Sequence, residues 1–502
     1  MGTNSYSFLS YKSAVWIIVF LMMLLIFTII LYLNFPSGFN QGIYHYQGLV
    51  LKNGGLPYID FVEKKGPMGL LTYSLASLFF GETIMAYRFF DLIILSLTAF
   101  SLFRLSRLNH SKIISFLIGV VWLRHVIIDG PGNTGDVTNI ITLCYVFLSY
   151  HLLKTKKTGY FLIAGITIAI ACWVKPTALL IGLPLILFFY FKKVKSINTI
   201  EWHYVLEFLL GMLIPSIIFL IYLLLTKTFY GFWESVVLDT LFNYSGYVSR
   251  FSTRTLFKTF WTFLNDPILR FGGILSLFVF SKNLVIKLIV IGVGLMLFVE
   301  GRFYPYQYSI LWPFLTLGFV EGIIILIKKL SKKKASVLII LCSIIIVFPI
   351  FKTGTVFIRS GFLTNNFDAG QTFLLPDFKE MYYQRKAVVS YLEHKISVDD
   401  EIFVLGQDPN IYLELGVITT CRLAREGFIL TGELTNSTPK HLISWQEELL
   451  EYMEDQKADR VIVLKKLTGL WIDVYSHRIN SILYDNYQFE HETEGHLIFK
   501  RK

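Results

Sequence analysis

Two carboxylates and two lysines lie within six residues of one another in the stretch 54–67, which reads GGLPYIDFVEKKGP. Glycine and proline at both ends are typical of a tight loop. A carboxylate can accept a proton as a general base, and an ammonium group can stabilise a departing anion. We therefore take this stretch, with Asp60, Glu63 and its two lysines, as part of a candidate active site. The alternative interpretation is a solvated, charged loop between two helices.

Residues of the same kinds occur at three places outside this loop. Arg88 begins the next long apolar run, where it either binds an anion or extends its charged end to the membrane interface. Asp136 closes a glycine-rich turn, 129–136, and either adds a carboxylate or complements the dipole of the helix that follows. That turn lacks the Lys-Ser/Thr pair of a P-loop, so it is a weak nucleotide signal. Lys175-Pro176 is either a simple corner or a further part of the site.

The composition predicts a membrane protein with many spans. Of 502 residues, 54% are hydrophobic and only 16% are charged. In a soluble protein a net charge of +11 would suggest that the protein binds nucleic acid. Here the lysines cluster at the ends of apolar runs, which indicates positive-inside topology. The four cysteines form no CxxC or Cys/His pattern, which argues against a disulfide framework or a zinc site.

About eleven spans are expected, and the first, at 14–33, is long enough to be a retained helix rather than a cleaved signal. Basic clusters occur at every second connection between the spans. The side of the membrane that these connections share, together with the N-terminus, is expected to be cytoplasmic. The loops at 35–85 and 227–267 and the tail from 353 then face outward. The run 67–80 is too short to cross and is expected to form an interfacial or re-entrant helix. The other ten expected spans are 86–105, 112–128, 137–153, 159–174, 177–192, 205–226, 268–281, 284–299, 306–327 and 335–352.

The tail differs in character from the spans. Alternating strands and amphipathic helices in it are typical of a small α/β domain. The sequence therefore divides into a transmembrane domain at 1–352 and an extracytoplasmic α/β domain at 353–502, and the latter contains no familiar catalytic motif. The expected strands are 402–406 and 460–464, and the expected helices are 378–396, 408–415 and 438–457.

The order of these motifs resembles the GT-C membrane glycosyltransferases, in particular bacterial members related to protein O-mannosyltransferases and aminoarabinose transferases. The likeness extends from the first span to about residue 320 and more faintly through the tail. In that family a glycine- and tyrosine-containing outer loop precedes an acidic residue, a lysine, a proline and an arginine. The residues that match this order are Gly42, Tyr44, Gly54, Gly55, Pro57, Tyr58, Asp60, Glu63, Lys65, Pro67, Gly81 and Arg88. Later matches are Asp136, Lys175, Pro176, Gly301, Arg302, Tyr308 and Pro313.

The resemblance implies transfer of a sugar from a polyprenyl-phosphate donor to an extracytoplasmic acceptor, with inversion at the anomeric carbon. A cell-surface polysaccharide is the expected acceptor, and a protein or a lipid is the alternative. The family's first acidic residue aligns with Asn40, whose amide is not a useful base, so a nearby carboxylate would take over that task. The implied roles are catalytic for Asp60, Glu63 and Asp136, donor phosphate-binding for Lys65, Arg88 and Arg302, and acceptor- or sugar-binding for Asn40, Tyr44, Tyr58 and Tyr308.

The residues indicate neither a metal site nor a cofactor, and a divalent cation is left open. The expected partners are the lipid-linked donor, the glycan acceptor and membrane lipid, without nucleic acid. Two other functions compete with sugar transfer. One is a transporter or flippase of lipid-linked sugars, which would hold its charges near the bilayer midplane. The other is an inactive scaffold, an interpretation that Asn40 supports. A transferase requires its charges to meet at one cavity on the outer rim.

Overall fold

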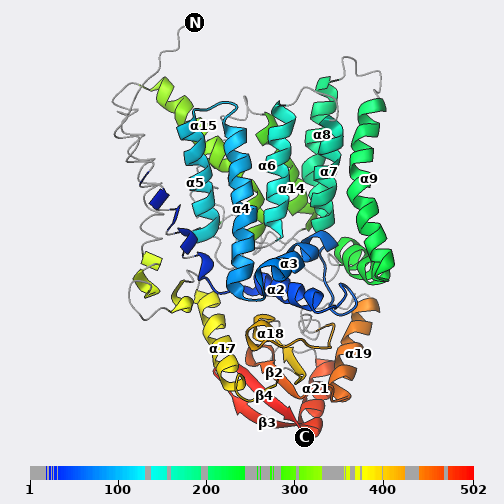
Figure 1. Ribbon diagram of the computed structural model, residues 1–502. Coiled ribbons are helices and arrows are strands. Elements are labelled where there is room, and N and C mark those ends of the chain that lie inside the picture. Colours follow the sequence, from blue (N-terminus) through cyan, green and yellow to red (C-terminus); the bar gives the residue numbers. More distant parts are fainter. Residues whose placement is uncertain are drawn as a thin grey trace.

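Apolar runs bounded by charged residues form the long helices of this protein, and a computed structural model shows them side by side in a bundle (Figure 1). The structure describes residues 32–129, 137–154, 160–193, 202–243, 284–300, 305–330, 376–397, 399–406, 408–423, 440–468 and 473–502, with shorter pieces within 19–30, 257–275 and 355–372. The bundle contains α4 (Ile84–Ser106), α5 (Lys112–Asp129), α6 (Thr138–Lys154), α7 (Tyr160–Val174), α8 (Leu179–Lys193), α9 (Trp202–Leu225), α14 (Leu284–Glu300) and α15 (Trp312–Lys329).

Three helical segments in the described part of the chain are long and apolar enough to cross a membrane, namely Ile84–Ser106, Trp202–Leu225 and Gln307–Lys329. The other bundle helices are shorter than such a span but lie alongside these three (Figure 1). Each of them begins and ends within three residues of an expected run. The expected spans at 268–281 and 335–352 lie outside the described residues, apart from isolated positions in the first.

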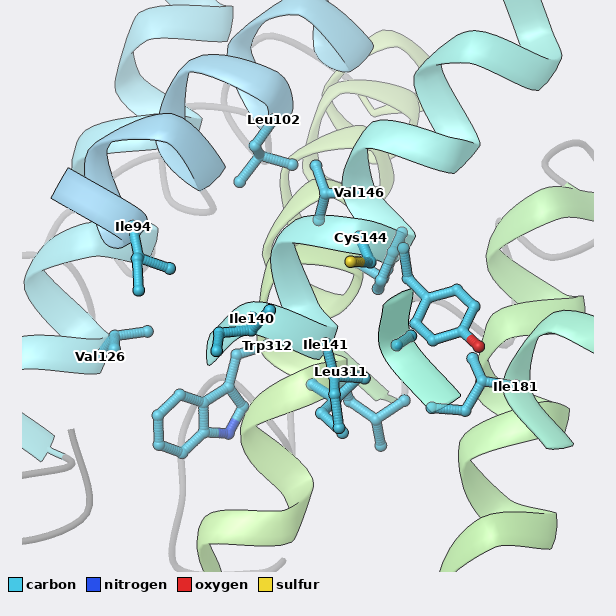
Figure 2. Packing of buried hydrophobic residues seen from close by; sticks show 14 of the residues in the cluster. Ile94, Leu102, Val126, Ile140, Ile141, Cys144, Val146, Ile181, Leu311 and Trp312 are labelled. Atoms are coloured by element: carbon cyan, nitrogen blue, oxygen red, sulfur yellow. The ribbon is translucent and has the colours of Figure 1, made fainter. Parts of the chain in front are cut away.

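The bundle core is a single cluster of aliphatic and aromatic side chains. Figure 2 shows part of it, where Ile94 from α4 and Val126 from α5 face Ile140 from α6 and Trp312 from α15. All of these side chains are less than 9% exposed. Close packing of this kind fixes the relative positions of the helix ends, and the ends carry the polar residues described below.

Two short helices lie across one end of the bundle, α2 (Phe39–Lys52) and α3 (Pro67–Phe80) (Figure 1). The helix at 67–80 was expected, and its bounds are confirmed. Helix α2 was not expected, since its segment was assigned to a loop. Further short helices at this end are η1 (Pro176–Ala178), α10 (Phe229–Phe232), the π-helix η2 (Trp233–Asn243) and η4 (Pro305–Leu311).

The C-terminal region forms a four-stranded sheet with helices, on the far side of α2 and α3 from the bundle (Figure 1). The strand order is β1-β2-β4-β3, in which β1 pairs with β2 in parallel and the other pairs are antiparallel. The expected α/β character is confirmed, and the β3–β4 hairpin was not expected. The elements are η5 (Ala369–Thr372), α17 (Pro376–Leu392), β1 (Ile402–Leu405), α18 (Asn410–Leu415), α19 (Lys440–Glu454), β2 (Arg460–Leu464), α20 (Lys465–Thr468), α21 (Asp473–Asn486), β3 (Tyr487–Glu492) and β4 (His496–Arg501).

A second hydrophobic cluster joins this sheet to the segment that contains α2. Tyr46, Val50 and Phe61 are buried in the same cluster as the strand residues of β1 and β2. The C-terminal domain and the 39–67 segment therefore share one core, and burial of apolar surface holds them together.

Candidate active site

Glu63 is a completely buried carboxylate that is held by hydrogen-bond donors. Its Oε2 atom accepts a 2.6 Å hydrogen bond from Nε2 of Gln47 in α2, and its Oε1 atom accepts from the backbone N–H groups of Lys64 (2.8 Å) and Lys65 (3.0 Å). A carboxylate accepts hydrogen bonds but does not donate them when ionised, so this set of donors matches the charged form. The loop therefore keeps a negative group away from bulk water.

A buried cation lies next to it in the chain. Nζ of Lys64 is 3.1 Å from Oδ2 of Asp239 in η2, and the two side chains are 8% and 0% exposed. Ionised groups of this kind are costly to bury unless they are paired. The pair joins the loop at 54–67 to η2.

Gly66 brings the same loop against the end of α7. Its backbone N–H donates to the carbonyl of Val174 at 3.0 Å, and a Cβ atom at this position would lie 2.0 Å from the carbonyl oxygen of Trp173. A side chain therefore does not fit at Gly66. Lys175 follows Val174 directly, so its backbone lies next to this loop, while its ammonium group contacts Glu300.

Glu300, the last residue of α14, is the centre of a second polar cluster. It accepts from Nζ of Lys175 (2.6 Å), Oγ1 of Thr177 (2.5 Å) and Nε2 of Gln307 (2.7 Å). The side chains of the Lys175–Glu300 ion pair are each 9% exposed. The two clusters occur at the same end of the bundle, where α7, η1, η4 and the 54–67 loop meet.

Asp60 has different surroundings from Glu63. It is exposed, and its Oδ2 atom accepts a 2.6 Å hydrogen bond from the backbone N–H of Leu56, four residues earlier. This contact closes the turn that contains Pro57 and Tyr58. Its predicted catalytic role stays a prediction, and the structure gives it a turn-stabilising contact.

Arg88 anchors the chain as it enters α2. Its guanidinium is fully buried, donates to the carbonyls of Phe35 (3.3 Å) and Pro36 (2.7 Å) and to Oε1 of Gln41 (2.7 Å), and lies 4.9 Å from the ring centroid of Tyr32. These contacts assign it a structural function. Its predicted contact with a donor phosphate stays a prediction.

The predicted sugar-binding tyrosines are buried. Tyr44 stacks on Tyr73 with ring centroids 5.6 Å apart, and Tyr58 donates from its hydroxyl to the carbonyl of Lys65 at 2.7 Å. Burial, and then the charge of Glu63, raises the pKa of the Tyr58 phenol well above its ordinary value, so this group stays protonated. Tyr308 is 6% exposed, in the middle of η4, which leads into α15. Tyr58 thus fixes the loop that carries Glu63.

For three predicted site residues the structure describes no side chain. Asp136 and Arg302 belong to the ranges 130–136 and 301–304, and for Asn40 only the backbone is described, at the start of α2. Five charged residues were expected to meet at one pocket, namely Asp60, Glu63, Lys65, Asp136 and Arg302. The described residues bring together Glu63 and the backbone of Lys65, with Asp60 on the surface of the same loop.

Several residues of the two clusters were missed or undervalued from the sequence. The signal for Asp239 and Glu300 was an acidic residue within or directly after an apolar stretch, where a charge requires a partner. No local signal identified Gln47, because its partner is sixteen residues away. Within the described residues, no group of three or more His, Cys, Asp and Glu side chains could hold a metal ion.

Comparisons with known proteins agree with this architecture. A family model described as dolichyl-phosphate-mannose-protein mannosyltransferase matches residues 64–222, a range that begins at Lys64 and includes Lys175. The solved structure of ArnT from Cupriavidus metallidurans bound to undecaprenyl phosphate superimposes with a TM-score of 0.64 and 10% identity over 96% of this chain and 97% of that chain. The chain has the GT-C fold. The resemblance to the GT-C membrane glycosyltransferases is therefore confirmed at the level of the fold.

Other comparisons are weaker. The same ArnT in its apo state matches with a TM-score of 0.57 and 10% identity, over 96% of this chain and 97% of that chain. An oligosaccharyltransferase from Archaeoglobus fulgidus in complex with zinc and sulfate gives a TM-score of 0.48 and 13% identity, over 96% and 73% of the two chains. A sequence search of curated proteins gives no match.

Proposed function

We propose that this GT-C protein transfers a sugar from a polyprenyl-phosphate donor to an acceptor on the outer face of the membrane. A cell-surface polysaccharide is the acceptor that we favour. The acceptor hydroxyl attacks the anomeric carbon, the bond from that carbon to the phosphate oxygen breaks, and the polyprenyl phosphate departs with its charge. Such a reaction requires a base near the hydroxyl and cations near the phosphate.

The observation that carries the proposal is a buried carboxylate, Glu63, in a loop that also contains the buried Lys64 and that contacts the segment before the buried Lys175. Lys64 follows Glu63 directly, and Lys175 is joined to the same loop through the contact of Gly66 with Val174. The fold gives further support, since the similar ArnT structure is one bound to undecaprenyl phosphate. We assign Glu63 as the general base, and Lys65 and Arg302 as phosphate-binding groups.

The orientation in the membrane is part of the proposal. Helices α4, α6 and α15 each begin near α3 or η4 and run away from the C-terminal domain (Figure 1). Their distal ends carry basic residues, namely Arg104, Lys154, Lys328 and Lys329. Basic residues favour the cytoplasmic side, which supports an extracytoplasmic position for the carboxylate clusters and the C-terminal domain.

Transfer is tested with the full-length protein purified in detergent. It is mixed with a panel of synthetic undecaprenyl-phosphate hexoses and pentoses that carry labelled sugars, and with membranes from a strain that lacks the gene as the acceptor source. We expect label to enter a macromolecular fraction as undecaprenyl phosphate is released in equal amount. Surface glycans of the deletion strain should lack the same sugar.

A transporter of lipid-linked sugars gives a different result in this assay. It would leave the bond between sugar and phosphate intact and would move labelled donor across the wall of a proteoliposome. Intact donor throughout the panel, with no loss of a sugar from the deletion strain, would overturn the proposed transfer.

A further inference from the structure

A segment of the C-terminal domain, Val417–Leu423, reaches the loop that carries Glu63. We call it the docking strap. Its backbone N–H at Thr419 donates to the hydroxyl of Tyr46 in α2 at 3.1 Å, and its carbonyl at Arg422 accepts from the backbone N–H of Val62 at 2.9 Å. Both contacts use backbone atoms of the strap, so they depend on where the strap lies rather than on its side chains.

The two residues that the strap contacts have a specific relation to the candidate base. Tyr46 directly precedes Gln47, and Val62 directly precedes Glu63. Gln47 and Glu63 are joined by the 2.6 Å hydrogen bond that holds the carboxylate. The strap thus fixes the chain on both sides of this bond.

The strap is itself anchored to the C-terminal domain by two carboxylates. Oε1 of Glu401 accepts from the hydroxyl of Thr419 (2.6 Å), the backbone N–H of Thr420 (2.7 Å) and the hydroxyl of Tyr452 (2.5 Å). The guanidinium of Arg422 donates two 2.6 Å hydrogen bonds to Glu448 in α19. Bidentate pairs of this type have a defined geometry, so the strap has little freedom of its own.

A second contact holds the first half of α2. The side chain of Asn410 in α18 lies against Gly42, where a Cβ atom would be 2.3 Å from Asn410 Oδ1 and 2.4 Å from its Cγ and Nδ2 atoms. The ring of Tyr412, two residues further along α18, packs against Tyr46 with centroids 5.0 Å apart. Only a residue without a side chain allows α2 to come this close to α18.

We propose that the C-terminal domain positions Glu63 for sugar transfer, through the docking strap and through the contact between Asn410 and Gly42. This inference rests on the proposed function. It assigns the domain a part in the reaction although it supplies no reacting group. A displacement of about 1 Å at a reacting group can cost about a hundredfold in rate, so such positioning has a measurable effect.

The test uses a variant that forces α2 and α18 apart. Gly42→Ala adds the Cβ atom that collides with Asn410, while alanine favours the helical conformation of α2 itself. Asn410→Ala removes all three colliding atoms, so the double variant Gly42→Ala/Asn410→Ala restores the space. The control is Arg478→Ala, which breaks ion pairs with Glu447 and Glu454 inside the C-terminal domain but touches neither the strap nor α2.

Four quantities are measured for each full-length variant: kcat for transfer, binding of undecaprenyl phosphate alone, thermal unfolding, and hydrogen exchange of a peptide that covers residues 60–66. For Gly42→Ala we expect kcat to fall about tenfold to a hundredfold, with undecaprenyl phosphate binding within about twofold of wild type. Exchange in the 60–66 peptide should become faster. The double variant should recover part of kcat and of the protection, because the collision is gone and the strap remains, although the hydrogen bond from Asn410 to Gly38 is lost. Arg478→Ala should keep both.

Normal kcat and normal exchange protection in Gly42→Ala would overturn the inference, as would equal losses in Arg478→Ala. If Gly42→Ala does not fold, Tyr46→Phe gives the same readouts, because it removes the acceptor of the Thr419 N–H and keeps the packing on Tyr412. The variant Glu63→Gln separates the two proposals. Full transfer by Glu63→Gln contradicts Glu63 as the base, whereas its loss together with normal kcat in Gly42→Ala and Tyr46→Phe contradicts only the positioning role.

Discussion

Gln47 and Glu63 are joined by a hydrogen bond of 2.6 Å between two buried side chains, one in the middle of α2 and the other in the loop before α3. The bond makes α2 and this loop one unit at the end of the helical bundle. The position of the carboxylate therefore depends on everything that holds α2, including Arg88 at its start and the C-terminal domain on its outer side.

Replacing Arg88 by lysine tests its structural assignment. An ammonium group cannot reach Phe35, Pro36 and Gln41 together, so the variant should lose about 1.5–3 kcal/mol of stability, the usual value of a buried hydrogen bond from a charged group. Thermal unfolding in detergent measures the loss. Lys52→Ala, which breaks an exposed ion pair with Glu82, is the control and should cost less than about 1 kcal/mol. Weaker undecaprenyl phosphate binding with unchanged stability would instead assign Arg88 to the donor phosphate.

The Glu300 cluster predicts unequal effects for its two charged residues. Glu300→Ala leaves the Lys175 ammonium buried without its partner, together with Thr177 and Gln307, and should destabilise the protein by about 3–5 kcal/mol. Lys175→Met should cost less, because Glu300 keeps two neutral donors. Unfolding temperatures of the two variants and of the double variant Lys175→Met/Glu300→Ala measure this difference. Equal losses in the two single variants would show that Thr177 and Gln307 do not stabilise Glu300.

His496 at the start of β4 predicts acid sensitivity of the C-terminal domain. Burial, partly offset by Asp408, lowers the pKa of His496 to about 4 from its ordinary value of 6.5. In the unfolded chain the His496 imidazole therefore binds a proton below about pH 6.5. In the folded chain it binds that proton only below about pH 4. Stability is full above pH 6.5 and falls as the pH drops through this window, by up to about 3 kcal/mol.

Thermal unfolding measured between pH 7 and pH 4 tests this dependence. His496→Gln should flatten it, and the exposed His394→Gln should leave it as in wild type. An unchanged pH dependence in His496→Gln would mean that another group causes the acid sensitivity.

Much of the fold could be predicted from periodicity and composition. The helix 67–80 was expected at its observed bounds because proline begins it and glycine ends it, and the strand 460–464 because it is a short β-branched run. Helix α2 was missed because Gly42 and Gly48 lower its helix propensity. Its structure depends on packing against α3 and α18, which no local pattern contains.

The candidate site was predictable only in part. Glu63 and Lys65 were recognisable from their loop and from the family resemblance. The surrounding contacts could not be predicted, because Glu63 accepts from Gln47 in α2, and the neighbouring Lys64 and Lys175 pair with the distant Asp239 and Glu300. From the sequence, Asp60 and Glu63 were equivalent candidates for a catalytic carboxylate. Tertiary packing separates them, because one carboxylate faces solvent and the other is enclosed by α2.

The most direct measurement of the central claim is sugar transfer by Glu63→Gln, compared with Asp60→Asn, using the labelled donor that wild type accepts. If Glu63 is the base, its variant should lose about a hundredfold or more in kcat and still bind undecaprenyl phosphate, whereas Asp60→Asn should keep most of the rate. A Glu63→Gln protein that transfers sugar at the wild-type rate would contradict the account.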